Sequence, residues 1–264
     1  MSTQTFSERL VTAEAAFAQI SSESGAASFQ DPLIVHVSSP AAFAAAHIPG
    51  AVLMTPMDLT LGESPAPGKL PPADRLSDAL QQAGYTKDRT LLLYDDEGGG
   101  WAGRLAWTLD VIGHERWLYI DGGLHAWAGA NLPLAQGPAA SNPAADKPDL
   151  TYNPALIARC EDLIDAIQDH DADDKLCIWD ARSLAEHTGE RSGSARAGRI
   201  PGSRHLDWLD VMDSERHLRL RTDLPELLAS RGIRPDRNLV VHCQTHHRSG
   251  LAYLVARLLG YPNV

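Results

Sequence analysis

The strongest constraint on the fold is an internal repeat. Three segments of the first half resemble three segments of the second half in the same order. The pairs are residues 33–37 with 176–180, 47–51 with 199–203, and 91–96 with 238–243. Extending the last pair also aligns Gly103 with Gly250. This order predicts two copies of one unit of about domain size.

Each copy alternates short apolar segments with helical patterns. Such alternation predicts an α/β fold in which each copy is a mostly parallel sheet with helices on both faces. We place the first copy at residues 1–135, a linker rich in Pro and Ala at 136–150, and the second copy at 151–264. Asn153 and Pro154 predict the start of a helix that contains residues 156–167.

The two copies differ at their ends. After Gly113 the first copy continues through residues 117–127 with an apolar segment, a glycine turn and a helical pattern. The second copy reaches only Val264, the position equivalent to Trp117. We therefore expect the second copy to lack its final strand and helix.

Charge and composition exclude several functions. A formal net charge of −11 argues against nucleic acid or an acidic membrane surface as the main partner. The sequence contains no apolar run near the ~20 residues of a membrane span and begins without a secretory signal pattern. Three widely spaced cysteines predict neither a disulfide framework nor a metal site, and we expect a cytoplasmic protein.

Cys243 has the surroundings of a reactive thiol. The apolar segment 239–241 predicts a buried strand, and the leucine-rich pattern of 251–259 predicts an amphipathic helix. Cys243 then lies between a strand end and the positive end of a helix. His246, His247 and Arg248 add cationic or proton-donating groups, which favour the thiolate and an anionic substrate. Cys160 and Cys177 lack such neighbours, and we expect both in the core.

The loop also carries a family resemblance. Residues 243–248, CQTHHR, resemble the active loop of the two-domain rhodaneses (thiosulfate sulfurtransferases), in particular a bacterial branch. The resemblance implies two tandem rhodanese-like domains, a persulfide on Cys243, and neither cofactor nor metal. It implies that thiosulfate is the donor and that a thiophile such as cyanide, or a protein, is the acceptor. The implied donor-binding residues of the loop are Gln244, Thr245, His246, His247 and Arg248.

Two further segments resemble the family. Asp180 and Arg182, followed by Glu186, stand at the end of a predicted strand and resemble a D-x-R…E signature. Arg182 then either approaches the donor or braces the loop through a carboxylate, and a purely structural ion pair is the alternative. Trp208 matches a position that carries an aromatic residue near the persulfide in similar proteins, or it is a core tryptophan.

The first copy is expected to be catalytically silent. Asp96 takes the place of the cysteine, and glycines 98–100 replace the cationic stretch. A carboxylate cannot carry a sulfur atom and would repel an anionic donor.

Several rival functions share parts of this pattern. Cysteine phosphatases and arsenate reductases need five residues between cysteine and arginine, whereas this loop has four. Mercaptopyruvate sulfurtransferases carry a neutral loop, whereas a cationic loop suits the dianion thiosulfate. A sulfur carrier that passes its persulfide to a protein needs the same loop and remains open. A degenerate interaction module ranks last, because Cys243 is present.

Overall fold

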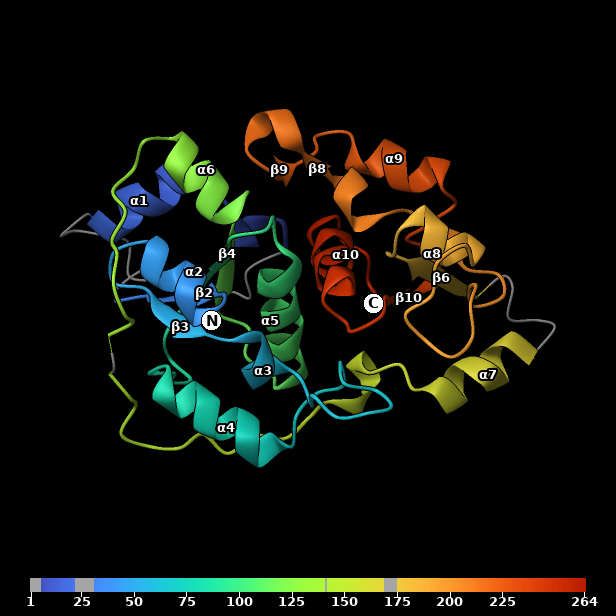
Figure 1. The fold of residues 1–264 in the computed structure, drawn as a ribbon, viewed down its shortest axis with the longest axis horizontal. Helices are drawn as coiled ribbons and strands as arrows, with labels where there is room; N and C mark the ends of the chain where they lie inside the picture. The colour runs from blue at the N-terminus through green and yellow to red at the C-terminus, as the bar shows by residue number, and fades with distance from the viewer. Residues whose placement is uncertain (1–5, 22–30, 141, 169–174) are drawn as a thin grey trace.

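The computed structural model describes residues 6–21, 31–140, 142–168 and 175–264 (Figure 1). The two halves of the chain lie beside each other. Helices α5 (Gly100–Val111) and α10 (Arg248–Leu258) pack together between them. Within the described residues, no helix has the length and apolar character needed to cross a membrane.

The first half is a five-stranded parallel sheet with the strand order β1-β5-β4-β2-β3. Its strands are β1 (Leu10–Val11), β2 (Leu33–Val37), β3 (Val52–Met54), β4 (Leu91–Asp95) and β5 (Trp117–Ile120). Besides α5, its helices are η1 (Phe6–Arg9), α1 (Ala13–Ser21), α2 (Pro40–Ala45), α3 (Pro56–Leu59), α4 (Ala73–Gln82) and α6 (Gly123–Gly129).

The second half contains a three-stranded parallel sheet in the order β10-β6-β7 and a two-stranded antiparallel sheet of β8 and β9. Its strands are β6 (Leu176–Asp180), β7 (Arg204–His205), β8 (Met212–Asp213), β9 (Arg219–Leu220) and β10 (Asn238–His242). Besides α10, its helices are η3 (Pro154–Leu156), α7 (Cys160–Gln168), α8 (Leu184–Thr188), η5 (Trp208–Val211), η6 (Ser214–Arg216) and α9 (Leu224–Ser230).

The structure confirms the repeated α/β unit. β4 and β10 are buried parallel strands that lead through short loops into α5 and α10. Gly50 and Gly202, which occupy matched turns, adopt left-handed backbone angles with φ of 80° and 76°. In the first half, β5 lies between β1 and β4, whereas the described residues of the second half contain no equivalent of β5.

The prediction of one continuous helix after Asn153 is wrong. The Asn153 side chain does accept from the Ala155 N–H at 3.1 Å, but only a short 3-10 turn follows, and Ile157 is extended. A second start signal explains the break, because the Asp162 carboxylate accepts from the Arg159 N–H at 3.3 Å and α7 begins at Cys160. Cys160 is consequently exposed, against expectation, whereas Cys177 is buried as expected.

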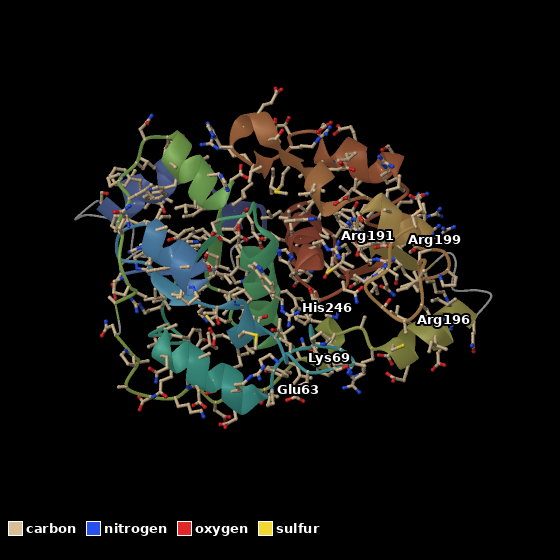
Figure 2. The ribbon with its side chains drawn as sticks, viewed as in Figure 1. Glu63, Lys69, Arg191, Arg196, Arg199 and His246 are labelled. Carbon is tan, nitrogen blue, oxygen red and sulfur yellow. The ribbon has the colours of Figure 1, made fainter. Side chains whose placement is uncertain are left out.

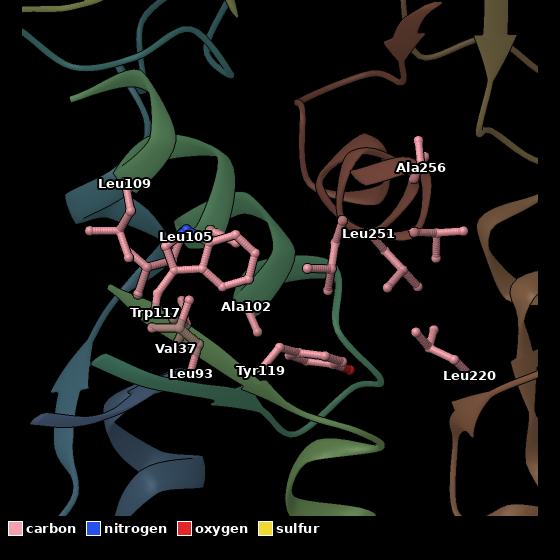
Figure 3. Close-up of a cluster of buried hydrophobic side chains, with 14 of the residues drawn as sticks. Val37, Leu93, Ala102, Leu105, Leu109, Trp117, Tyr119, Leu220, Leu251 and Ala256 are labelled. Atoms are coloured by element: carbon pink, nitrogen blue, oxygen red, sulfur yellow. The ribbon is translucent and has the colours of Figure 1, made fainter. Parts of the chain in front are cut away.

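One hydrophobic core extends across both halves (Figure 3). Ala102 and Leu105 of α5 face the first sheet, while Leu251 and Ala256 of α10 belong to the same cluster on the other side. The helices approach so closely at Gly103 that a Cβ atom there would lie 2.5 Å from the Gly250 carbonyl oxygen. The two glycines aligned by the repeat therefore meet at the contact between the copies.

The close contact between Gly103 and Gly250 leads to a prediction about stability. Gly103→Ala should lower the free energy of unfolding by about 1–3 kcal/mol through overpacking, although alanine normally stabilises a helix interior. Urea denaturation followed by circular dichroism measures the change. Gly193→Ala is the matched control, because its Cβ would meet Gln244 at an ordinary 3.6 Å. A Gly103→Ala variant as stable as that control would contradict the packing argument.

Candidate active site

Cys243 lies at the junction that the sequence predicts. β10 ends at His242, α10 begins at Arg248, and Cys243 is half-buried between them. His246 adopts a left-handed backbone with φ of 57°, within the loop that joins strand to helix. The Cys243 Sγ lies 3.6 Å from the hydroxyl of Ser249, a residue of the first turn of α10 that the sequence analysis did not single out. The thiol is thus held at the positive end of that helix.

Arg248 is fixed by a carboxylate from α8. Its two terminal nitrogens donate to the two Glu186 oxygens at 2.6 and 3.0 Å, a paired geometry that orients the guanidinium. The Glu186 carboxylate also accepts from the Ser183 hydroxyl at 2.8 Å at the start of α8. Arg248 lowers the pKa of Glu186 to about 2. Glu186 raises the pKa of Arg248, and the Cys243 thiolate adds to that increase, so a permanent positive charge lies beside the thiol.

Arg182 belongs to a second carboxylate cluster. The Arg182 Nε and Nη2 atoms donate to the fully buried Asp180 carboxylate at 2.8 and 2.6 Å, and Nη2 also donates to the Gly198 carbonyl at 2.9 Å. His187 contacts the same carboxylate at 2.9 Å. Burial acts to raise the pKa of Asp180, but the hydrogen bonds from Arg182 and His187 hold it well below its usual range. These contacts suit an Arg182 that braces the loop and equally an Arg182 in a structural ion pair.

His242 is the third group at Asp180 and was missed by the sequence analysis. Its Nε2 atom lies 3.7 Å from an Asp180 oxygen. Burial lowers the pKa of His242 to about 4, so the ring is neutral near pH 7. A histidine directly before the cysteine gave no signal, because the pattern 239–242 reads as an apolar strand that ends in one polar residue.

The two histidines of the loop diverge. The His247 ring stacks on Trp101 with centroids 4.5 Å apart, meets Trp208 edge-on at 5.1 Å, and places Nε2 2.5 Å from a Glu97 oxygen. The structure thus holds His247 at the interface between the halves, whereas the sequence placed it among donor-binding residues. Trp208 is half-buried in the same cluster.

His246 is exposed, yet its ring carries no charge near neutral pH. Desolvation by the crowded loop, together with the nearby charges of Arg104 and Lys69, lowers its pKa. Of the two roles expected of His246, cationic or proton-donating, the lowered pKa favours the second, and Arg248 supplies a fixed positive charge in the loop. In Figure 2, His246 lies near Lys69 of the first half, with Arg191, Arg196 and Arg199 of the second half farther along.

The remaining loop residues contact both halves. The exposed Gln244 side chain donates to the Gly193 carbonyl at 3.4 Å. The Thr245 backbone lies so close to Gly68 of the first half that no side chain fits there. The same holds for Gly100 beneath the His247 ring. The run of glycines at 98–100 was the sequence signal for the close contact at Gly100, although it did not identify His247 as the contacting residue.

In the first half, a carboxylate fills the position where an anion would bind. Asp95 accepts from the backbone N–H groups of Glu97, Gly99 and Ala102 at 3.2, 2.8 and 2.9 Å, at the start of α5. Asp96, the residue aligned with Cys243, accepts from the Ser38 hydroxyl at 3.1 Å. The Asp95 carboxylate therefore takes the backbone N–H groups at the N-terminus of α5 that could otherwise bind an anion. This supports the prediction of a silent copy.

Two copies of a parallel α/β unit, with one cysteine at a strand-to-helix junction, define a class of duplicated α/β proteins. A family model for the rhodanese-like domain matches residues 20–130 and 160–264, and the chain belongs to this family.

Named relatives agree with that family. The chain is 44% identical over 232 residues to a thiosulfate sulfurtransferase of Azotobacter vinelandii, covering 88% of this chain and 83% of that protein. It is 42% identical over 233 residues to a thiosulfate sulfurtransferase of Pseudomonas aeruginosa, with the same coverage of 88% and 83%. A crystal structure of SseA from Escherichia coli, described with the rhodanese fold of 3-mercaptopyruvate sulfotransferases, superposes with a TM-score of 0.81 at 26% identity. That match covers 97% of this chain and 96% of the other.

The Glu186–Arg248 pair gives the first prediction from the site. Glu186→Gln should reduce sulfur transfer by about tenfold, because Arg248 loses a charged hydrogen-bond partner. Glu190→Gln, a change of an exposed neighbouring acid, is the control. Because the pKa of Glu186 is lowered in the folded protein, the pair stabilises the fold above about pH 4.5, the usual Glu value, and loses this effect as pH falls toward 2. The stability difference between wild type and Glu186→Gln should shrink over that interval, and a difference that grows would contradict the pairing.

The expectation that the first copy is silent gives the second prediction. Asp96→Ala should leave the rate of sulfur transfer within about twofold of wild type, because the Asp96 carboxylate bonds to Ser38 within the first half. A steady-state assay with thiosulfate measures this. A loss of activity without a loss of folded protein would show that the first half takes part through Asp96.

Proposed function

We propose that this chain is a thiosulfate sulfurtransferase that moves sulfane sulfur to a thiophilic acceptor through a persulfide on Cys243. The observation that carries this proposal is the single thiol at the N-terminus of α10, with the carboxylate-anchored Arg248 beside it. The similarity to two thiosulfate sulfurtransferases supports the choice of donor. The donor is a dianion, for which a fixed cation at a helix N-terminus is the appropriate recognition element.

The first step is a displacement at sulfur. The Cys243 thiolate attacks the sulfane sulfur of thiosulfate, a sulfur–sulfur bond forms, and the original sulfur–sulfur bond breaks with its electron pair leaving on sulfite. Arg248 stabilises the departing sulfite charge. Gln244, Thr245 and His246 shape the entrance for the donor, while His247 holds the loop against Trp101.

The second step returns the enzyme to its starting state. A thiophile such as cyanide attacks the outer sulfur of the persulfide, takes it as thiocyanate and leaves the thiolate on Cys243. Both steps balance without a redox partner, a metal or a cofactor.

The supporting residues act through position. We propose that Asp180 with Arg182, and Glu186 with Arg248, keep the loop preorganised, and that Trp208 packs beneath it. We further propose the domain limits 1–135 and 151–264 with a linker between them, and a cytoplasmic location. In this arrangement the first domain is catalytically silent and the second carries Cys243.

Two alternatives keep the same loop. The fold match to SseA favours 3-mercaptopyruvate as a second candidate donor. Delivery of the persulfide sulfur to a protein acceptor is the other alternative, and it differs only in what reaches Cys243 in the second step.

Intact-protein mass tests the proposal. Incubation with thiosulfate should add the mass of one sulfur atom, located on Cys243, and cyanide should remove it with release of thiocyanate. Cys243→Ala should take up no sulfur, whereas Cys160→Ser, a change of the exposed cysteine, should behave as wild type. Sulfur uptake by Cys243→Ala would reject the assignment, and uptake from 3-mercaptopyruvate alone would replace thiosulfate as the donor.

A further inference from the structure

Arg104 of α5 is a buried cation without a carboxylate partner among the described residues. Its side chain is fully inaccessible to solvent. The Nη1 and Nη2 atoms donate to the carbonyl oxygens of Gly68 and Leu59 at 2.8 and 2.7 Å, and Nε has no hydrogen-bond partner. The face of Trp107 lies 4.7 Å from the Cζ atom.

A charge in such a place needs a compensating anion. A guanidinium does not give up its proton in a protein, and a buried ion is costly unless a charge of opposite sign balances it. Two carbonyl dipoles and one ring offset only part of that cost. Burial lowers the pKa of Arg104 to about 10, and the groups that oppose this are the thiolate of Cys243 and the hydroxyl of Tyr152. Burial raises the pKa of Tyr152 to about 12, so its hydroxyl is neutral near pH 7 and supplies no countercharge.

Arg104 also lies directly behind the active loop. A Cβ atom on Gly250, in the first turn of α10, would lie 2.8 Å from the Arg104 Cα atom. Gly68, whose carbonyl accepts from Arg104, is pressed against the Thr245 backbone. The charge of Arg104 acts on His246 as well. The Arg104 backbone thus packs on the first turn of α10, and its guanidinium is held by Gly68, which contacts the active loop at Thr245.

We propose that Arg104 is a positioning residue that provides the buried countercharge for the Cys243 thiolate and persulfide. The silent half would then contribute a fixed cation to the reaction of the other half. This inference rests on the proposed function only in that Cys243 is the nucleophile. Because Arg104 is buried, salt should not screen its effect, in contrast to that of exposed cations such as Lys69.

The test is the pH profile of alkylation by iodoacetamide, a neutral reagent that reports the thiolate. It is run in the Cys160→Ser background, which removes the exposed thiol. Because Cys177 is buried, the half-buried Cys243 is then the thiol that the reagent reaches. Arg104→Gln should move the midpoint of the profile up by about one pH unit, and alkylation below the midpoint should slow about tenfold. Arg104→Lys, which keeps the charge, should show little of this shift, with a midpoint close to that of wild type.

Arg75→Gln is the matched control. Arg75 donates to the carbonyls of Thr60 and Leu61, next to the segment that Arg104 holds, but it is exposed. We expect its midpoint to equal that of wild type. An Arg104→Gln profile that coincides with the Arg75→Gln profile, in folded protein, would overturn the proposal. So would an Arg104→Lys shift as large as that of Arg104→Gln, because it would assign the effect to the hydrogen bonds and not to the charge.

A second measurement uses the unaltered arginine and does not depend on the folding of a variant. Cys243 alkylated with iodoacetate carries a carboxylate, whereas iodoacetamide leaves a neutral amide of similar size. The carboxymethyl protein should melt several degrees higher, and the difference should persist at high salt, because a buried charge is not screened. A difference that disappears at high salt would assign the field to exposed cations and reject Arg104. Neither measurement uses thiosulfate, so the persulfide experiment can fail independently.

Discussion

The close crossing of α5 and α10 is the contact on which the rest of the structure depends. Because Gly103 and Gly250 meet without side chains, the two helices bring their N-terminal loops together. The loop after β4 then touches the loop after β10, and His247 reaches Glu97 and Trp101 of the other half. The first copy therefore packs against the loop that carries Cys243 in the second copy and holds that loop in place.

The positions of nearby carboxylates differ between the N-termini of α5 and α10. In the second half, Asp180 and Glu186 pair with Arg182 and Arg248, which keeps the cations ordered and leaves the end of α10 to Cys243. In the first half, Asp95 turns into the end of α5 and takes three backbone N–H groups. The same strand–loop–helix geometry thus differs between the copies, because the carboxylates lie away from the helix N-terminus in one copy and at it in the other.

Sequence reasoning identified the elements that have local signals. The repeat, the parallel α/β units and the position of Cys243 follow from periodicity and spacing, and the structure and the family match agree with them. The continuous helix after Asn153 was wrong, because two capping signals compete over a few residues and their order of preference depends on packing. The lowered pKa of His246 had no signal in the sequence, since desolvation is a property of the folded loop.

By itself, the sequence determined a duplicated α/β fold with one cysteine between a strand end and a helix start, because strand and helix periods and the residues around Cys243 are local in the chain. Only the tertiary structure decided which groups surround that thiol. The pairing of Arg248 with Glu186, the place of His247 between Trp101 and Trp208, and the burial of Arg104 all join residues that are distant in sequence or in different halves. No local pattern encodes such partners, since they follow from how two sheets and two helices pack against each other.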